Sequence, residues 1–155
     1  MNLNMKCNKA IFFCLFLLSF SVFSKTPTFS EYNVGNVYDG VNHALVEPQS
    51  GNVSVDTLRI SASHKKANFS GHFYLYTFGC GGGAICGEIL DLKTGRVVTG
   101  LPDAYDGNSF DLDFKPDSSL LIIYGTSLSS TPSDEESASD MVVYYNFDSN
   151  TLKKL

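Results

Sequence analysis

The sequence predicts an all-β protein whose antiparallel sheets form two blade-like units, stacked as a partial propeller or a sandwich. Three observations predict this fold class. Apolar positions fall in short runs of β-branched and aromatic residues, Gly, Asp, Asn, Ser and Pro separate these runs, and no segment after residue 24 has a convincing helical spacing. The chain beyond residue 24 has the length of one domain that can bury a core.

The best-defined part of the predicted sheet is a hairpin in the middle of the chain. We expect one strand over residues 73–78 and the next over residues 85–92, because both are rich in aromatic and β-branched residues. The glycine-rich segment between them predicts the hairpin loop. The turn at residues 93–95 then leads into a short strand over residues 96–98.

The remaining elements are expected on either side of this hairpin. Strong strands are predicted at residues 120–124 and 141–147, and weaker ones at residues 58–62 and 110–114. Several strands are apolar on both faces, so we expect the sheet to be covered on both sides. Residues 26–56 predict an irregular lead-in with one or two short strands. The polar, acidic residues 130–140 predict a mobile hairpin tip.

A weak internal repeat groups the strong strands into two units. Residues 73–97 and 120–154 each read as a strand, a long loop, a second strand, an acidic turn and a basic edge strand. The order F-x-P-D-x-x-x-L before the second unit and the turn D-x-x-T-G at the end of the first resemble blades of β-propeller repeat proteins. A closed propeller needs about four or more blades, so two units predict a partial one. An ordinary antiparallel meander would have similar turns and is the alternative.

Residues 1–24 have the pattern of a secretory signal. Lys6 and Lys9 precede an apolar stretch, residues 10–20, that is too short to cross a bilayer. Cleavage before Lys25 would leave a single β domain, residues 25–155, with a net charge of −7, because the signal removes two of the eleven basic residues and no acid. This acidic balance argues against a nucleic-acid partner and against an anionic membrane, and it suits a basic protein such as a toxin or an enzyme.

The exported chain would retain two cysteines, Cys80 and Cys86, which close a glycine-rich loop. In an oxidising compartment this spacing predicts a disulfide, since a metal pair would need two further ligands that the sequence does not supply in a recognised pattern. The glycines permit positive φ angles and leave backbone amides uncovered. The predicted binding residues at this tip are Gly81, Gly82, Gly83 and Ala84, with no cofactor and no metal.

Enzymatic chemistry has weaker support in the sequence. His72 could act as a general base with Asp91 or Glu88, which would make the protein a periplasmic hydrolase. A nucleophilic Cys80 beside His72 is incompatible with the predicted disulfide. Four acids gather further along the chain, at Asp103, Asp106, Asp111 and Asp113. Their spacing departs from an EF-hand loop and predicts ordinary loop and strand-end acids.

The block from Phe69-Ser-Gly-His-Phe through Gly79-Cys-Gly, Cys86-Gly and Asp91-Leu-Lys-Thr-Gly resembles a motif of small uncharacterised exported bacterial proteins. That resemblance implies a Gram-negative periplasm and carries over no catalytic residue. The expected architecture is also similar to periplasmic immunity proteins built as partial propellers, by analogy alone. The leading hypothesis is therefore a protein-binding inhibitor or immunity factor. A hydrolase and an envelope assembly component are the alternatives.

Overall fold

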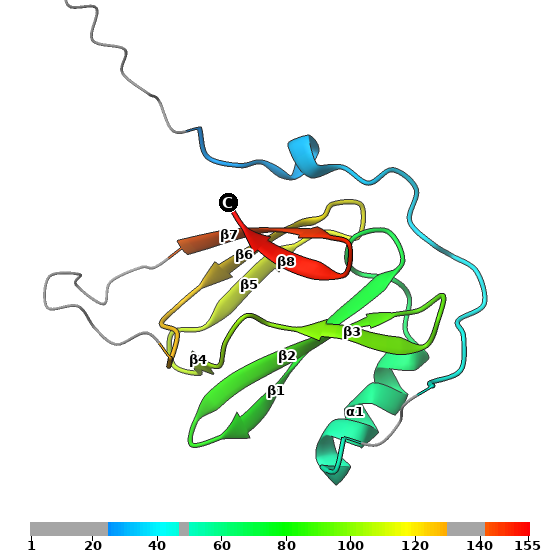
Figure 1. Ribbon diagram of the computed structural model, residues 1–155, viewed down its shortest axis with the longest axis horizontal. Helices are drawn as coiled ribbons and strands as arrows, with labels where there is room; N and C mark the ends of the chain where they lie inside the picture. Colours follow the sequence, from blue (N-terminus) through cyan, green and yellow to red (C-terminus); the bar gives the residue numbers. More distant parts are fainter. Residues whose placement is uncertain (1–24, 47–49, 130–141) are drawn as a thin grey trace, which may run out of the picture.

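The computed structural model describes residues 25–46, 50–129 and 142–155, and in them two antiparallel sheets and an α-helix (Figure 1). The predicted export signal and the acidic residues 130–140 lie outside this part of the chain. The first sheet contains β1 (Phe73–Gly81), β2 (Ala84–Asp91), β3 (Arg96–Gly100) and β4 (Tyr105–Asp106). The second contains β5 (Asp111–Phe114), β6 (Leu120–Tyr124), β7 (Val142–Asp148) and β8 (Thr151–Lys154).

Both sheets are antiparallel and open, which confirms the all-β prediction. The first has the order β1-β2-β3, with β4 pairing with β2, and the second has the order β5-β6-β7-β8. The predicted repeat corresponds to two three-stranded meanders, β1-β2-β3 and β6-β7-β8. The sheets do not close, however, and the partial-propeller arrangement is not confirmed.

The hydrophobic core lies between the two sheets, where each strand alternates between an inward and an outward residue. Inward side chains of β1 and β2 meet inward side chains of β6 and β7. The fully or nearly buried members are Phe69, Phe73, Leu75, Ile89, Tyr105, Leu121, Ile123 and Phe147. Phe69, which precedes β1, contacts Phe114 and Phe147 with ring centroids 6.0 and 5.4 Å apart, so aromatic packing joins the sheets.

The other face of the first sheet is covered by a helix that the sequence analysis missed. Residues 58–62 were predicted as a strand, but they lie inside α1 (Val53–Ser63), so this prediction is wrong. Asn52 begins the helix by accepting hydrogen bonds from the amides of Ser54 and Val55. Leu58 and Ile60 alternate with polar residues as they would in a strand, yet both are exposed, while Val55 and Ala62 are buried.

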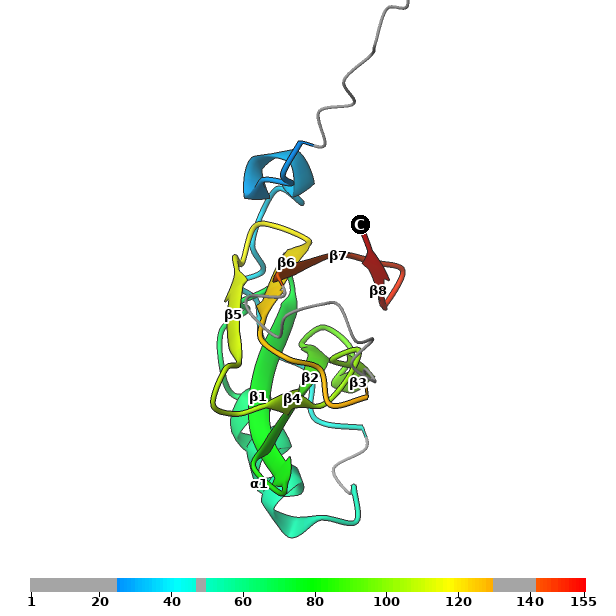
Figure 2. The ribbon, with the colours of Figure 1, turned by 90° about the vertical axis from the view of Figure 1, so that its left-hand side faces the viewer.

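This helix packs against β1 and β2 (Figure 2). Between it and the sheet lies a second, smaller core, formed by Ala62, Ala67, Leu90 and Leu92. The first sheet is therefore covered on both faces, as its two-sided apolar strands predicted. Within the described residues, no helix has the length and apolar character needed to span a membrane.

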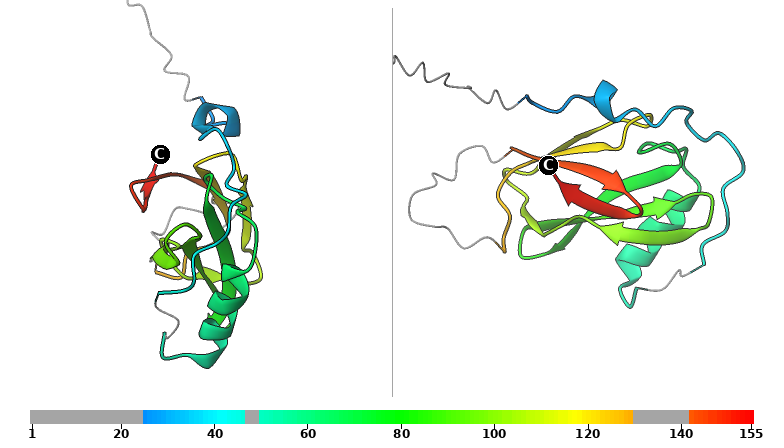
Figure 3. Two further views of the ribbon diagram at one scale, coloured as in Figure 1. Left: turned by 90° about the vertical axis from the view of Figure 1, so that its right-hand side faces the viewer. Right: turned by 45° about the horizontal axis from the view of Figure 1, so that its top comes forward.

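The lead-in before α1 runs along one side of both sheets (Figure 3). Its described residues contain a short 3-10 helix, η1 (Phe29–Tyr32), and an isolated bridge between Asn33 and Ser118, in place of the one or two predicted strands. Backbone hydrogen bonds attach this segment to the loops of the sheets at several points. The amide of Tyr38 donates to the carbonyl oxygen of Gly71 and that of His43 to the carbonyl oxygen of Leu92, each at 2.8 Å. The lead-in is irregular because it follows loops rather than a free strand edge.

Candidate functional site

The loop at the tip of the β1–β2 hairpin is bare backbone. Gly81, Gly82 and Gly83 have φ angles of +109°, +59° and +83°, a region that side-chain-bearing residues rarely adopt. All three are exposed, and a Cβ atom added to any of them would meet nothing within 4 Å. The tip projects from the lower left of the molecule in Figure 1. Its backbone is therefore accessible without side-chain cover, apart from the Gly83 carbonyl, which accepts a hydrogen bond from Gly107.

The predicted disulfide between Cys80 and Cys86 closes this loop. The register of the hairpin shifts between Gly79 and Gly81, so Cys80 lies in an irregularity and faces Cys86, with the two Cα atoms 5.8 Å apart. Both sulfurs are bonded to each other, and neither is a thiolate nucleophile. The idea of a Cys80–His72 catalytic pair is therefore ruled out in this oxidised form.

A second set of contacts holds the loop from the side. The amide of Gly107 donates a hydrogen bond of 3.0 Å to the carbonyl oxygen of Gly83, and Ala84 pairs with Asp106 in β4. The Ala84 side chain is buried, so only the glycines of the predicted binding set lie at the surface. The tip is thus restrained by one covalent and several backbone links.

The structure brings His72 near Asp91, as one of the catalytic hypotheses required. His72 Nε2 lies 3.6 Å from Asp91 Oδ1, which is too long for a hydrogen bond, and the imidazole packs on the Phe73 ring with centroids 4.1 Å apart. Asp91 instead accepts hydrogen bonds from the Lys93 amide and the Thr94 hydroxyl, at 2.9 and 2.8 Å. Its carboxylate shapes the β2–β3 turn.

The protonation of His72 follows from this environment. Burial lowers its pKa below 6.5, and the attraction of Asp91 opposes this effect while Lys93 adds to it. His72 is therefore neutral at neutral pH and has the protonation state of a general base. It lines a pocket of about 580 Å³ together with residues of the β7–β8 turn, among them Ser149 and Asn150.

Backbone strain gathers around the same pocket. Ser70, Ser149 and Asn150 have φ angles of +43°, +51° and +63°, and all three line it. Such conformations cost on the order of 1 kcal/mol each and are common both at functional sites and in tight turns. Here Ser149 and Asn150 form the two-residue β7–β8 hairpin, where positive φ is the favoured geometry.

Glu88, the other carboxylate proposed for His72, points to the opposite face of the sheet. Arg59 of α1 donates to it from Nε at 2.9 Å and from Nη2 at 2.7 Å, and the Tyr76 hydroxyl also donates to it. Burial opposes its ionisation, but these hydrogen bonds outweigh burial and lower its pKa. Glu88 joins the helix to the sheet and is not available to His72, so the His72–Glu88 pairing is not formed.

The four acids between residues 103 and 113 are dispersed over separate elements. Asp103 accepts hydrogen bonds from the hydroxyls of Ser127 and Ser129, and Asp106 binds the amide of Asn108. Asp111 and Asp113 lie on β5 and are exposed. Across the ranges 25–46, 50–129 and 142–155, no group of three or more acids, histidines or cysteines is arranged to hold a metal ion.

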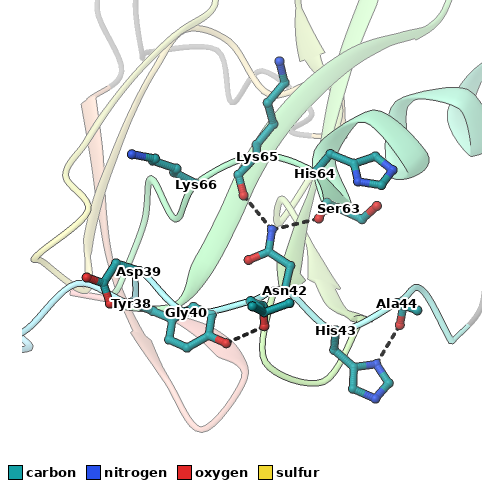
Figure 4. A pocket seen from close by; sticks show the side chains of 11 residues that line it. Tyr38, Asp39, Gly40, Asn42, His43, Ala44, Ser63, His64, Lys65 and Lys66 are labelled. Carbon is teal, nitrogen blue, oxygen red and sulfur yellow. Dashed lines mark hydrogen bonds between the residues drawn. The ribbon is translucent and has the colours of Figure 1, made fainter.

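One further pocket, of about 520 Å³, lies between the lead-in and the end of α1 (Figure 4). Asn42 forms its centre and donates to the carbonyl oxygens of Ser63 and Lys65, both at 2.8 Å. Sequence reasoning did not single out this asparagine, because its partners are more than twenty residues away. The Lys65 and Lys66 side chains extend in different directions (Figure 4), so they do not converge on a common ligand.

Comparison with protein-family models, curated proteins and solved structures finds no match to this chain. Of the predicted sites, the glycine tip and its disulfide are fully assembled, His72 and Asp91 are neighbours, and Glu88 belongs to a separate structural pair.

Proposed function

We propose that this protein is exported to the periplasm and binds another protein there, as an inhibitor or immunity factor, by docking the glycine tip on its partner. The observation that carries the proposal is the exposed backbone of Gly81–Gly83, restrained by the Cys80–Cys86 disulfide and by Gly107. A restrained loop loses little conformational entropy on binding, so more of its interaction energy appears as affinity.

The partner's chemistry follows from the rest of the chain. The sequence carries sixteen acids against eleven basic residues, which favours association with a basic protein by steering it toward the complex. The export pattern in residues 1–24 and the disulfide agree with an oxidising compartment. These features together support a periplasmic toxin or enzyme as the target.

The test compares two Gly→Asn variants, of which only one changes the glycine tip. Asn tolerates a left-handed conformation, so Gly82→Asn should preserve the loop while adding a side chain to the docking surface. Gly35→Asn is the matched control, because Gly35 also has a positive φ, +85°, and open space around it, in the lead-in. The exported protein and each variant are used to capture partners from periplasmic extract of the source cells.

We expect the wild type and Gly35→Asn to recover the same stoichiometric partner, and Gly82→Asn to recover at least tenfold less. Thermal unfolding of the variants checks that each remains folded. If folded wild-type protein recovers no stoichiometric partner, or if all three proteins recover it equally, docking through the tip is wrong.

A hydrolase is the second candidate, because neutral His72 lies 3.6 Å from Asp91 at a pocket. This arrangement offers a base, but the Asp91 carboxylate is already bonded to the β2–β3 turn. Incubation with peptidoglycan sacculi distinguishes the two functions. Soluble muropeptides released by the wild type but not by His72→Gln would favour the hydrolase.

A further inference from the structure

The outer face of the second sheet has an unusual composition for a surface exposed to water. Alternation along β5, β6 and β7 places one set of residues outward while their neighbours enter the core. A half-exposed antiparallel sheet normally presents polar residues on this side. Here the outward set at the β6–β7 end is Asp111, Asp113, Ile122, Tyr124, Val142 and Tyr144, which we call the tyrosine–aspartate face.

Strand register makes these residues neighbours across three strands. Asp111 lies opposite Tyr124, which in turn lies opposite Val142, while Ile122 lies between Asp113 and Tyr144. Ile122 is 8% exposed and forms the floor, whereas Val142 is 37% exposed. Burial raises the pKa of Tyr124, and repulsion from Asp113, Tyr144 and Asp111 adds to it, consistent with a clustered arrangement. The face is therefore a continuous patch of two acids around aromatic and aliphatic surface.

Other parts of the two outer sheet faces carry a covering segment. The helix α1 packs on the outer face of the first sheet. On the second sheet, the η1 segment is fastened where β6 begins, because Ser118 donates to the carbonyl oxygens of Phe29 and Tyr32. Leu120, next to this anchor, is fully buried. Tyr124 and Tyr144 lie further along the sheet and keep part of their surface exposed.

The two acids decide what kind of molecule fits this surface. Neither Asp111 nor Asp113 forms an ion pair with another residue among those described. A second copy of this chain would bring the same carboxylates together, and like charges at an interface are unfavourable. A surface with Lys or Arg side chains would pair with both carboxylates, and the partly exposed tyrosines would supply the aromatic contact area typical of interface centres.

We propose that the tyrosine–aspartate face is a second docking surface, which receives Lys or Arg side chains of a basic protein partner. The hairpin tip and the adjoining ends of β6 and β7 lie on the same side of the molecule, at the left in Figure 1. The biological meaning of the face rests on the proposed protein-binding function. Its test does not use the glycine tip, so either proposal can fail alone.

The test uses an oligolysine peptide of ten residues as the basic probe, added to the 15N-labelled mature protein at low salt. We expect backbone NMR shifts to change most in β5 and at the adjoining ends of β6 and β7. In the Asp111→Asn/Asp113→Asn variant the peptide should bind about tenfold more weakly, roughly threefold for each exposed carboxylate. Raising the salt concentration should reduce this difference.

Two controls separate the face from general acidity. Asp39→Asn changes the charge of the exposed lead-in and should weaken binding less than twofold. Tyr144→Ser keeps both acids and should weaken binding about threefold, because aromatic contact is lost. Shift changes centred away from β5–β7, or equal weakening of binding by Asp39→Asn and by Asp111→Asn/Asp113→Asn, would overturn the proposal. The two proposals can also be separated. If oligolysine still shifts the signals of β5–β7 but partner capture does not depend on Gly82, only the proposed function is wrong.

Discussion

The ion pair between Arg59 and Glu88 gives the sharpest test of how α1 is held on the sheet. The two side chains are 13% and 15% exposed, and two hydrogen bonds of 2.9 and 2.7 Å join them. Breaking a buried pair by removing one partner costs about 3–5 kcal/mol. Residual exposure and the remaining Tyr76 hydrogen bond reduce this, so Arg59→Met should lower the free energy of unfolding by about 2–3 kcal/mol.

The measurement is urea unfolding at pH 7, followed by circular dichroism. Lys153→Met is the matched control, since it breaks a Lys153–Asp148 pair whose side chains are 58% and 52% exposed and should cost less than about 1 kcal/mol. Arg59→Met/Glu88→Met removes both charges and should cost less than the sum of the two single changes. The reasoning would be refuted if Arg59→Met and Lys153→Met lowered the free energy of unfolding equally, or if the double variant cost the full sum of its two single changes.

The same pair predicts a pH dependence with a definite sign. The pKa of Glu88 in the folded protein lies below its ordinary value of 4.5, so the folded state binds fewer protons than the unfolded state near that pH. Its contribution to stability is full above about pH 4.5 and is lost as the pH falls through the folded pKa. The difference between wild type and Arg59→Met should therefore shrink on acidification, as repeated unfolding at pH 3 can show.

Three further predictions concern the hairpin and its surroundings. The native mature protein should contain no alkylatable thiol, and reduction of the Cys80–Cys86 disulfide should cost about 2 kcal/mol of stability in urea unfolding, the entropy of so short a loop. Gly95→Ala should destabilise by at least about 3 kcal/mol, because φ is +70° and the new Cβ would collide with the carbonyl oxygen of Ala44; an unchanged melting temperature would contradict the observed backbone. The lowered pKa of His72 makes the unfolded state bind more protons below pH 6.5, so stability should fall as the pH drops from there, and His72→Gln should remove that part of the fall.

Local sequence patterns were sufficient for the hairpin and its tip. Continuous runs of aromatic and β-branched residues predicted the strands around Leu75 and Ile89, and such runs are typical of strands that are buried on both faces. Three consecutive glycines permitted a loop with positive φ, and the spacing of Cys80 and Cys86 allowed one bridge across it. These features depend on neighbours within about ten residues, which the chain itself specifies.

Tertiary contacts explain the two predictions that were wrong, the strand at residues 58–62 and the pairing of Glu88 with His72. The alternation of Leu58 and Ile60 resembles a strand, but the cap at Asn52 and the packing of α1 on the sheet make a helix. Glu88 was matched with a nearby histidine, whereas its partner Arg59 comes from a helix 29 residues earlier.

The class of fold, the central hairpin and the disulfide-closed glycine tip follow from short-range periodicity and backbone stereochemistry, so the order of residues along the chain was enough to predict them. Tertiary packing was needed to show which face of the first sheet α1 covers, that Glu88 pairs with Arg59 of this helix, and that Asp111 lies beside Tyr124 on the second sheet. Long-range packing brings together residues whose separation along the chain carries no local signal, and it favours the arrangement that buries the most apolar surface while pairing the buried charges.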